Sequence, residues 1–175
     1  RRILLVLSGV VIGMIANRLL LPHTLEKGTR DLITNYKQVT RELLREVLAH
    51  LNQRGNAHTI NQLFAVSTFI EERIMLNNQM LQIDGVENFL SSQRRLNHAI
   101  YDVFLRLQRK DVDVELMEEI FAELDLILDL EGDRINEQVG QLYDRLQLSH
   151  SLGEYVLLKD ALRIFKGFRK QAGFK

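Results

Sequence analysis

The chain has 175 residues and a formal net charge of zero, because 23 Lys and Arg residues balance 23 Asp and Glu residues. This balance excludes a global electrostatic field that would draw the protein to nucleic acid. The absence of Cys excludes disulfides, thiolate zinc sites and cysteine nucleophiles. A single Pro, no Trp and 26% charged residues favour an all-α fold. Since the first residue is Arg1, we expect a piece of a longer polypeptide whose missing part lies upstream.

The first segment predicts a transmembrane helix over residues 1–22. From Ile3 to Leu21 the residues are apolar or small except Asn17 and Arg18. At about 1.5 Å per residue, such a helix spans roughly the 30 Å of hydrocarbon in a bilayer. Arg18 lies near the end, where its long stem can carry the charge to the interface, and Asn17 can pair with backbone or a neighbouring helix. We therefore place Asn17, Arg18 and Pro22 at the membrane interface.

Small residues gather on one face of this predicted span. Their spacing of three or four residues lets another helix approach closely, as in the small-xxx-small pattern of membrane helix pairs. The residues are Ser8, Gly9, Gly13 and Ala16. We expect this face to pack against other transmembrane helices of the same polypeptide or of other protomers, so the segment would be the last helix of a larger membrane module.

Two other interpretations of the segment stay open. A signal peptide would also begin with an Arg pair and an apolar run, but no small-x-small cleavage site follows Met14. A buried helix of a soluble bundle would explain the Asn17-Arg18 interruption. Basic residues crowd the C-terminal side of the span, which predicts a bacterial inner-membrane protein with the residues after Pro22 in the cytoplasm. Those basic residues are Arg18, His23, Lys27, Arg30, Lys37, Arg41 and Arg45.

Residues 23–175 read as a cytoplasmic bundle of amphipathic helices. Thr24 is a candidate N-cap for a first helix that ends near Gln53, and Gly55 suits its C-cap. A capping box over residues 59–62 predicts the start of a second helix, which runs to about Leu81. Apolar residues recur at helical spacing through both segments. Short connections of this kind favour antiparallel packing of neighbouring helices.

The second half of the chain predicts further helices. A turn at Asp84-Gly85 precedes a segment from Val86 to Lys110. Asp111 to Asp113 supply caps for a fourth segment that continues to about Gln147, as one helix or two. A second capping box at residues 151–154 opens a final helix. The predicted fold is therefore all-α, with one transmembrane helix followed by an antiparallel helical bundle.

Two charged stretches in this half of the chain are candidates for metal binding or for docking on a charged surface. The fourth segment is dense in carboxylates, namely Glu115, Glu118, Glu119, Glu123, Asp125, Asp129 and Glu131. No Glu-x-x-His pair accompanies them, and no calcium-loop spacing fits, so we interpret them as a solvated face without a metal. The final helix is basic, with Lys159, Arg163, Lys166, Arg169, Lys170 and Lys175. It could dock on the anionic leaflet, dock on the acidic fourth segment or be an ordinary amphipathic helix.

No motif for catalysis or cofactor binding is visible. The chain lacks a Gly-rich phosphate loop, a nucleophile elbow and a catalytic triad pattern. We therefore expect a protein that is not an enzyme and needs no cofactor. Its expected partners are the lipid bilayer, other transmembrane helices and further copies of itself, and not nucleic acid.

The first 30 residues resemble the last transmembrane helix of the FUSC family, the fusaric acid resistance and aromatic acid exporter proteins. The resemblance rests on an Arg followed by an apolar run with Ser8-Gly9-Val10-Val11-Ile12-Gly13, closing on Asn17-Arg18-Leu19-Leu20-Leu21-Pro22. In that family a helical cytoplasmic region follows such a helix. The resemblance implies the C-terminal part of an inner-membrane efflux transporter whose soluble domain serves assembly or regulation. It carries over no substrate-binding residue.

Two other functional classes compete with the exporter. A transmembrane helix followed by Leu21-Pro22-His23-Thr24-Leu25 is similar to the entry of a HAMP signal relay, which requires two short helices of equal heptad pattern. The first helix predicted here is too long for that, and no catalytic histidine box follows. An anchored adaptor whose bundle binds a partner needs nothing before Arg1. The transported substrate and the energy coupling are not encoded in any pattern we find.

Overall fold

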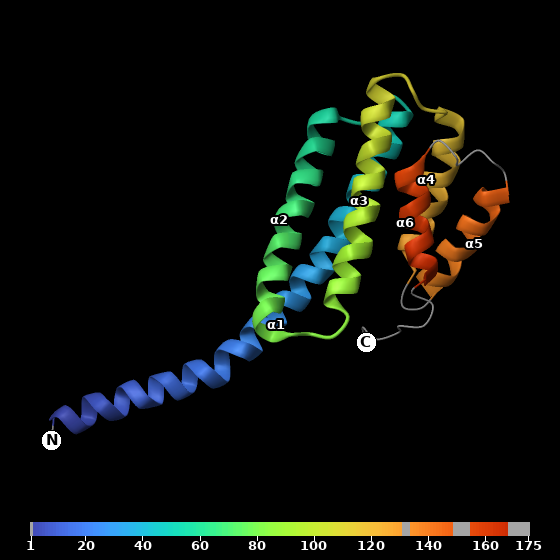
Figure 1. The fold of residues 1–175 in the computed structure, drawn as a ribbon. Helices are drawn as coiled ribbons and strands as arrows, with labels where there is room; N and C mark the ends of the chain where they lie inside the picture. Colours follow the sequence, from blue (N-terminus) through green and yellow to red (C-terminus); the bar gives the residue numbers. More distant parts are fainter. Residues whose placement is uncertain (1, 131–133, 149–154, 168–175) are drawn as a thin grey trace.

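The computed structural model describes the backbone of residues 2–130, 134–148 and 155–167. It describes side chains from His23 onward within these ranges, except those of residues 136, 147, 148 and 165–167. All regular structure in the described ranges is helical, so the chain has an all-α fold (Figure 1). The six helices follow in the order α1 (Arg2–Leu51), α2 (Ala57–Leu81), α3 (Val86–Gln108), α4 (Val114–Leu128), α5 (Arg134–Leu148) and α6 (Val156–Gly167).

Helix α1 differs from the prediction because it runs through Pro22 without ending. The sequence predicted two helices here, a transmembrane helix over residues 1–22 and a new helix with its N-cap at Thr24, but one helix covers Arg2 to Leu51. A Pro inside a helix removes one backbone hydrogen bond and disturbs the carbonyl four residues earlier, yet it need not end the helix. The C-terminal part of α1 lies within the bundle, and its N-terminal part projects beyond it (Figure 1).

The connection between α1 and α2 depends on close backbone contact at Gly55. A Cβ atom at this position would lie 2.5 Å from the backbone nitrogen of His50 and 2.6 Å from the carbonyl oxygen of Glu46. Gln53, with φ of 59°, takes the left-handed conformation after the helix. Gly55 therefore serves this close approach, and the prediction that it is the C-cap of the first helix was wrong.

Helix α2 begins earlier than the capping-box pattern predicted. Asn56 is the N-cap, because its Oδ1 accepts a hydrogen bond of 2.8 Å from the backbone N–H of His58. The Glu46 carboxylate accepts another, of 2.6 Å, from the backbone N–H of Asn56. Asn is among the strongest N-cap residues, and it competes successfully with the downstream Thr59. The helix ends at Leu81, as predicted, with Gln82 in the left-handed conformation.

The remaining helix boundaries lie close to those predicted from the sequence. Gly85, with φ of 80°, precedes α3 in the predicted turn. Asp113 caps α4 by accepting a hydrogen bond of 3.1 Å from the backbone N–H of Leu116. The fourth predicted segment is two helices, α4 and α5, and α4 closes at Asp129. The capping box predicted at residues 151–154 lies outside the described residues.

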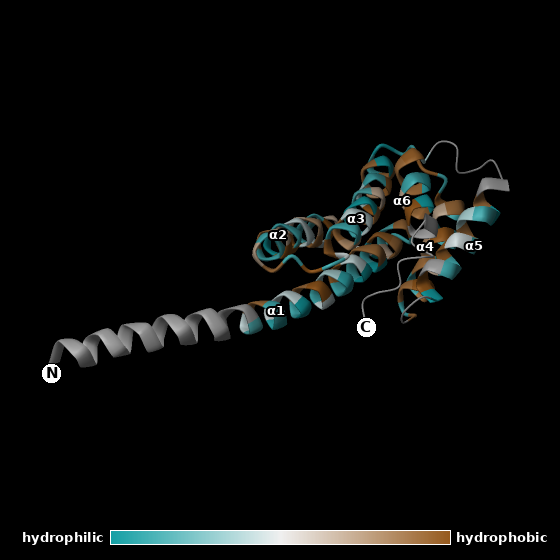
Figure 2. Cartoon of the chain, turned by 60° about the horizontal axis from the view of Figure 1, so that its bottom comes forward, coloured by the Kyte–Doolittle hydropathy of each residue, from teal (hydrophilic) through white to brown (hydrophobic). Residues whose placement is uncertain are grey.

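Two apolar clusters form the core. The larger one joins the C-terminal part of α1 and the start of α2 to α3, α4, α5 and α6, and it includes Leu43, Ile60, Phe104, Phe121, Tyr143 and Leu162. The smaller one joins α1, α2 and α3 through Ile33, Tyr36, Ile70, Ile74, Val86 and Leu90. Helices α1, α2 and α3 each contribute to both clusters, and α1 packs against α2, α3 and α4. Helix α2 packs on α1 and α3 and lies at the outer edge, away from α4, α5 and α6 (Figure 2).

Candidate functional site

The residues predicted to meet the membrane or its helices all lie in the projecting part of α1. Ser8, Gly9, Gly13 and Ala16 are within the helix, as are Asn17, Arg18 and Pro22. Their side chains lie outside those that the structure describes. Among the residues available for a search, no helix combines the length and the apolar character needed to cross a bilayer.

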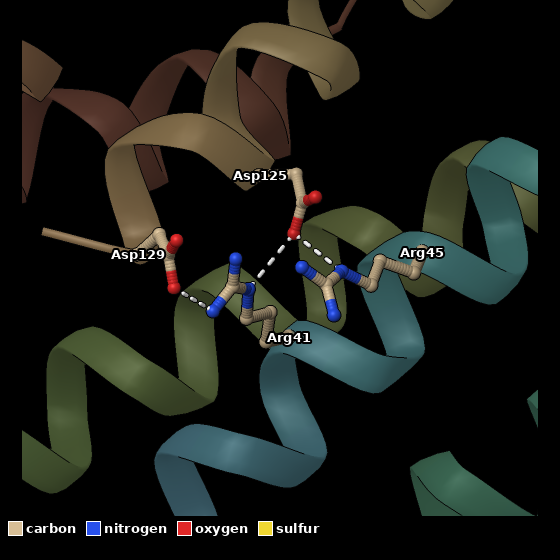
Figure 3. A network of polar contacts seen from close by, with 4 residues as sticks. All are labelled: Arg41, Arg45, Asp125 and Asp129. Carbon is tan, nitrogen blue, oxygen red and sulfur yellow. Dashed lines mark hydrogen bonds and ion pairs between the residues drawn. The ribbon is translucent and has the colours of Figure 1, made fainter.

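An ion-pair cluster fastens α1 to α4 at the surface (Figure 3). Two guanidinium groups share one carboxylate: Arg41 Nε lies 3.0 Å and Arg45 Nε 2.8 Å from Asp125 Oδ1. Arg41 also pairs with Asp129, one turn further along α4. The hydrogen bond from Arg41 lowers the pKa of Asp129 and, in return, the pKa of Arg41 is raised. This cluster holds two helices of the bundle together.

The acidic fourth segment is thus only partly a solvated face. Its carboxylates Asp125 and Asp129 turn toward α1, and Glu123 pairs with Arg145 on α5. Exposed carboxylates such as Glu115 and Glu119 fit the prediction of a solvated face. No three His, Asp or Glu side chains in the described part of the chain come together in a way that could hold a metal ion.

Helix α6 packs mainly against α3 and α5. The hydroxyl oxygen of Tyr155, just before α6, accepts a hydrogen bond of 2.8 Å from the backbone N–H of Asp113, and Arg95 on α3 pairs with Asp160 at 2.6 Å. Arg163 pairs with Asp160 within its own helix. The first half of this basic helix is therefore an amphipathic element of the core, while the predicted basic residues from Lys166 onward lie outside the described side chains.

A buried polar network lies where α1, α2 and α3 meet. The Tyr36 hydroxyl donates a hydrogen bond of 3.1 Å to Glu71 Oε2, and Arg94 pairs with the other carboxylate oxygen of Glu71. Tyr36 is 1% exposed and Glu71 is 8% exposed, so both are shielded from water. Burial and, next, the charge of Glu71 raise the pKa of Tyr36 above its usual range. One carboxylate thereby links three helices.

Two buried amides on α3 are unusual. The side chain of Asn97 is 1% exposed and lies near enough to the Tyr36 hydroxyl to lower the pKa of Tyr36, but neither its amide nitrogen nor its amide oxygen has a hydrogen-bond partner among the described residues. The Gln93 Oε1 atom is also buried without a partner. Unpaired buried polar groups cost free energy of about 1–3 kcal/mol each. The interior of the bundle is therefore polar at this level rather than uniformly apolar.

The outward face of α2 exposes large apolar side chains. Phe69 is 63% exposed, Leu76 is 54% exposed and Met80 is 72% exposed, with Val66 at 45%. The sequence pattern placed Val66, Phe69 and Met80 among the apolar positions at helical spacing in a second helix that packs back against the first. Of that pattern Ile70 and Ile74 are buried, and together with Ile60 and Ser67 they form the buried face. The only sequence signal for an exposed apolar face was that the second helix carries more apolar positions than one packed face requires.

Known proteins add no further constraint. No protein-family model matches the chain, and no curated protein or solved structure matches it either. The resemblance of the first 30 residues to exporters of the FUSC family stays a prediction from those residues.

Proposed function

We propose that the chain is the C-terminal part of an inner-membrane efflux transporter resembling the aromatic acid exporters of the FUSC family. In this proposal residues 1–22 cross the membrane as the last helix of a larger module, and residues 23–175 form a cytoplasmic bundle that serves assembly or regulation. The apolar stretch from Ile3 to Leu21, its small-residue face and the basic residues that follow it support this assignment.

The observation that carries the proposal is the continuity of α1. The same helix that contains the apolar stretch supplies Tyr36, Leu43 and Val47 to the core of the bundle, each at most 1% exposed. No loop separates the two parts. A displacement of the apolar stretch is therefore transmitted directly to the bundle, and the assembly state of the bundle acts back on the stretch.

A membrane-anchored signalling or adaptor module is the second candidate. The exposed apolar face of α2 favours the adaptor, because a large exposed apolar patch commonly marks a binding surface. The uninterrupted length of α1 disfavours the HAMP-like relay, which requires short helices joined by a connector. Reading the gene upstream of the Arg1 codon discriminates these classes: several apolar spans there favour the exporter, one extracytoplasmic domain favours a receptor, and neither of these favours the adaptor.

The assembly role is tested by substitutions on the small-residue face. Gly9→Leu and Gly13→Leu place branched side chains where a neighbouring helix would approach, so we expect fewer oligomers after amine crosslinking in membranes. Val11→Leu is a matched control at a position between the two glycines. If the unsubstituted chain in membranes gives only monomers, the assembly role is wrong.

A further inference from the structure

Helix α2 has one face with no neighbour among the described residues. It packs on α1 and α3 through its buried side, and both views place it at the edge of the bundle (Figures 1 and 2). The opposite side carries Val66, Phe69, Leu76 and Met80, whose side chains are 45–72% exposed. Exposed apolar groups at this density are costly in water unless a partner covers them.

The spacing of this outward face is that of a coiled coil. Steps of four and three residues alternate strictly along Gln62, Val66, Phe69, Arg73, Leu76 and Met80, and all six are exposed. In heptad notation Val66, Arg73 and Met80 are a positions, and Gln62, Phe69 and Leu76 are d positions. We call these six residues the α2 seam. At about 1.5 Å per residue the seam is roughly 28 Å long.

We propose that the α2 seam binds the α2 seam of a second copy of this chain, as a parallel two-stranded coiled coil. This inference rests on the proposed membrane anchoring, because two copies held in one membrane present their helices in the same direction. A β-branched residue at a, here Val66, and Leu at d, here Leu76, favour parallel two-stranded packing. Anchoring in one membrane also raises the effective concentration of one α2 seam near the other.

Charge complementarity identifies the second copy as the occupant. Arg73, at an a position, and Glu72, at the flanking g position, are both exposed, and neither forms an ion pair with any described residue. In parallel packing the two Arg73 side chains lie in one layer, and each also inserts beside the g residue of the facing helix, so the Glu72 of the other copy can offset the repulsion between the two guanidinium groups. The apolar stem of Arg73 packs in the seam while its charged end reaches the rim. A single charged a position also fixes the register.

Disulfide crosslinking tests the seam directly because the chain contains no Cys. Phe69→Cys and Gln62→Cys place thiols at d positions, which face their own counterparts in a parallel pair. Met75→Cys is the matched control, since it is 43% exposed on the same helix but outside the seam. In membranes that contain the full chain, we expect both d variants to form a disulfide dimer on the order of tenfold faster than Met75→Cys. Equal or absent dimer formation overturns the proposal.

A charge-swap series tests the identity of the partner. In the Gln62→Cys background, Arg73→Glu puts like charges together, and we expect disulfide formation to slow by about tenfold. The double variant Glu72→Arg with Arg73→Glu restores the pairing and should return the rate to near that of Gln62→Cys alone. If the double variant stays slow, the pairing between copies is wrong.

The outcomes separate this inference from the proposed function. Amine-crosslinked oligomers without seam disulfides would leave the assembly role standing and overturn the α2 seam. Seam disulfides in a chain that does not sediment with membranes would support the seam and count against the anchor. A Phe69→Cys thiol that is protected from a water-soluble alkylating reagent but forms no dimer would show that lipid or another protein covers the face, which also overturns the proposal.

Discussion

Two polar clusters attach α1 to its neighbours, and they differ in their contact with water. Tyr36 pairs with Glu71 inside the bundle, where both residues are less than a tenth exposed. Only a few residues further along, Arg41 pairs with Asp125 and Asp129 at the surface. Water competes more strongly for the surface partners, of which Arg45 and Asp129 are more than half exposed, than for the Tyr36–Glu71 hydrogen bond. The buried cluster should therefore carry more of the stability, although the surface cluster contains more ion pairs.

The largest predicted effect is the loss of the shared buried carboxylate. Glu71→Ala leaves the Tyr36 hydroxyl without its acceptor and Arg94 without its ion-pair partner. Removing one member of a buried pair costs about 3–5 kcal/mol; because Arg94 is half exposed, we expect about 2–4 kcal/mol of unfolding free energy to be lost. Urea denaturation measures it. Glu42→Ala, on an exposed position of α1, should change stability by less than about 0.5 kcal/mol. Equal losses in the two variants would contradict the comparison.

Tyr36→Phe should have an intermediate effect that depends on pH. Removing the hydroxyl at neutral pH costs about 1–2 kcal/mol, since Glu71 loses one hydrogen bond. The pKa of Tyr36 is raised in the folded state, so its stabilising contribution is complete below the unfolded pKa of about 10 and is lost as the pH rises toward the folded value.

The unsubstituted protein should accordingly lose stability above about pH 10 more steeply than Tyr36→Phe, and the difference between them should narrow. Unfolding midpoints measured from pH 8 to 11 check this prediction. A constant difference over that range would mean that Tyr36 ionises as readily in the folded chain as in the unfolded one.

The surface cluster should give the smallest effect. Asp125→Asn removes the acceptor that Arg41 and Arg45 share, and we expect a loss of about 0.5–1 kcal/mol that largely disappears in 1 M salt. Because Arg41 lowers the pKa of Asp129, the contribution of that pair is present above the unfolded pKa of about 3.9 and is lost as the pH falls through the lower folded value. Asp129→Asn should make the unfolding free energy depend less on pH in this acidic range. A salt-independent loss in Asp125→Asn would show that the cluster is better shielded than its exposure indicates.

The helices could be predicted from sequence because their signals are local. Apolar spacing, the turn at Gly85 and the cap at Asp113 act over a few residues, and the structure confirms them. The continuation of α1 through Pro22 could not be predicted, because a Pro can end a helix or be tolerated within it. The start of α2 at Asn56, before the predicted capping box, involves Glu46, ten residues before Asn56, and the close approach at Gly55, so the local pattern did not reveal it.

The polar clusters and the α2 seam were beyond sequence reasoning for a different reason. Glu71 and Arg94 look like ordinary charged positions on two helices until the helices are packed together. Asp125 likewise belonged to an acidic run with no visible partner, because Arg41 is far away in sequence. Phe69 and Leu76 share the helical spacing of core residues, and only the packing of α2 shows which of its two apolar faces is covered.

Membrane flotation of the full chain tests the central claim, that α1 joins a membrane-spanning stretch to the bundle, most directly. We predict that the chain floats with lipid vesicles after a carbonate wash. Val11→Arg, which puts a charge in the middle of the stretch at a cost of about 2.5–3.5 kcal/mol, should weaken this association. Val114→Arg, on an exposed position of α4, should float like the unsubstituted chain. Recovery of the unsubstituted chain in the carbonate supernatant, with its helical content intact, would contradict the claim.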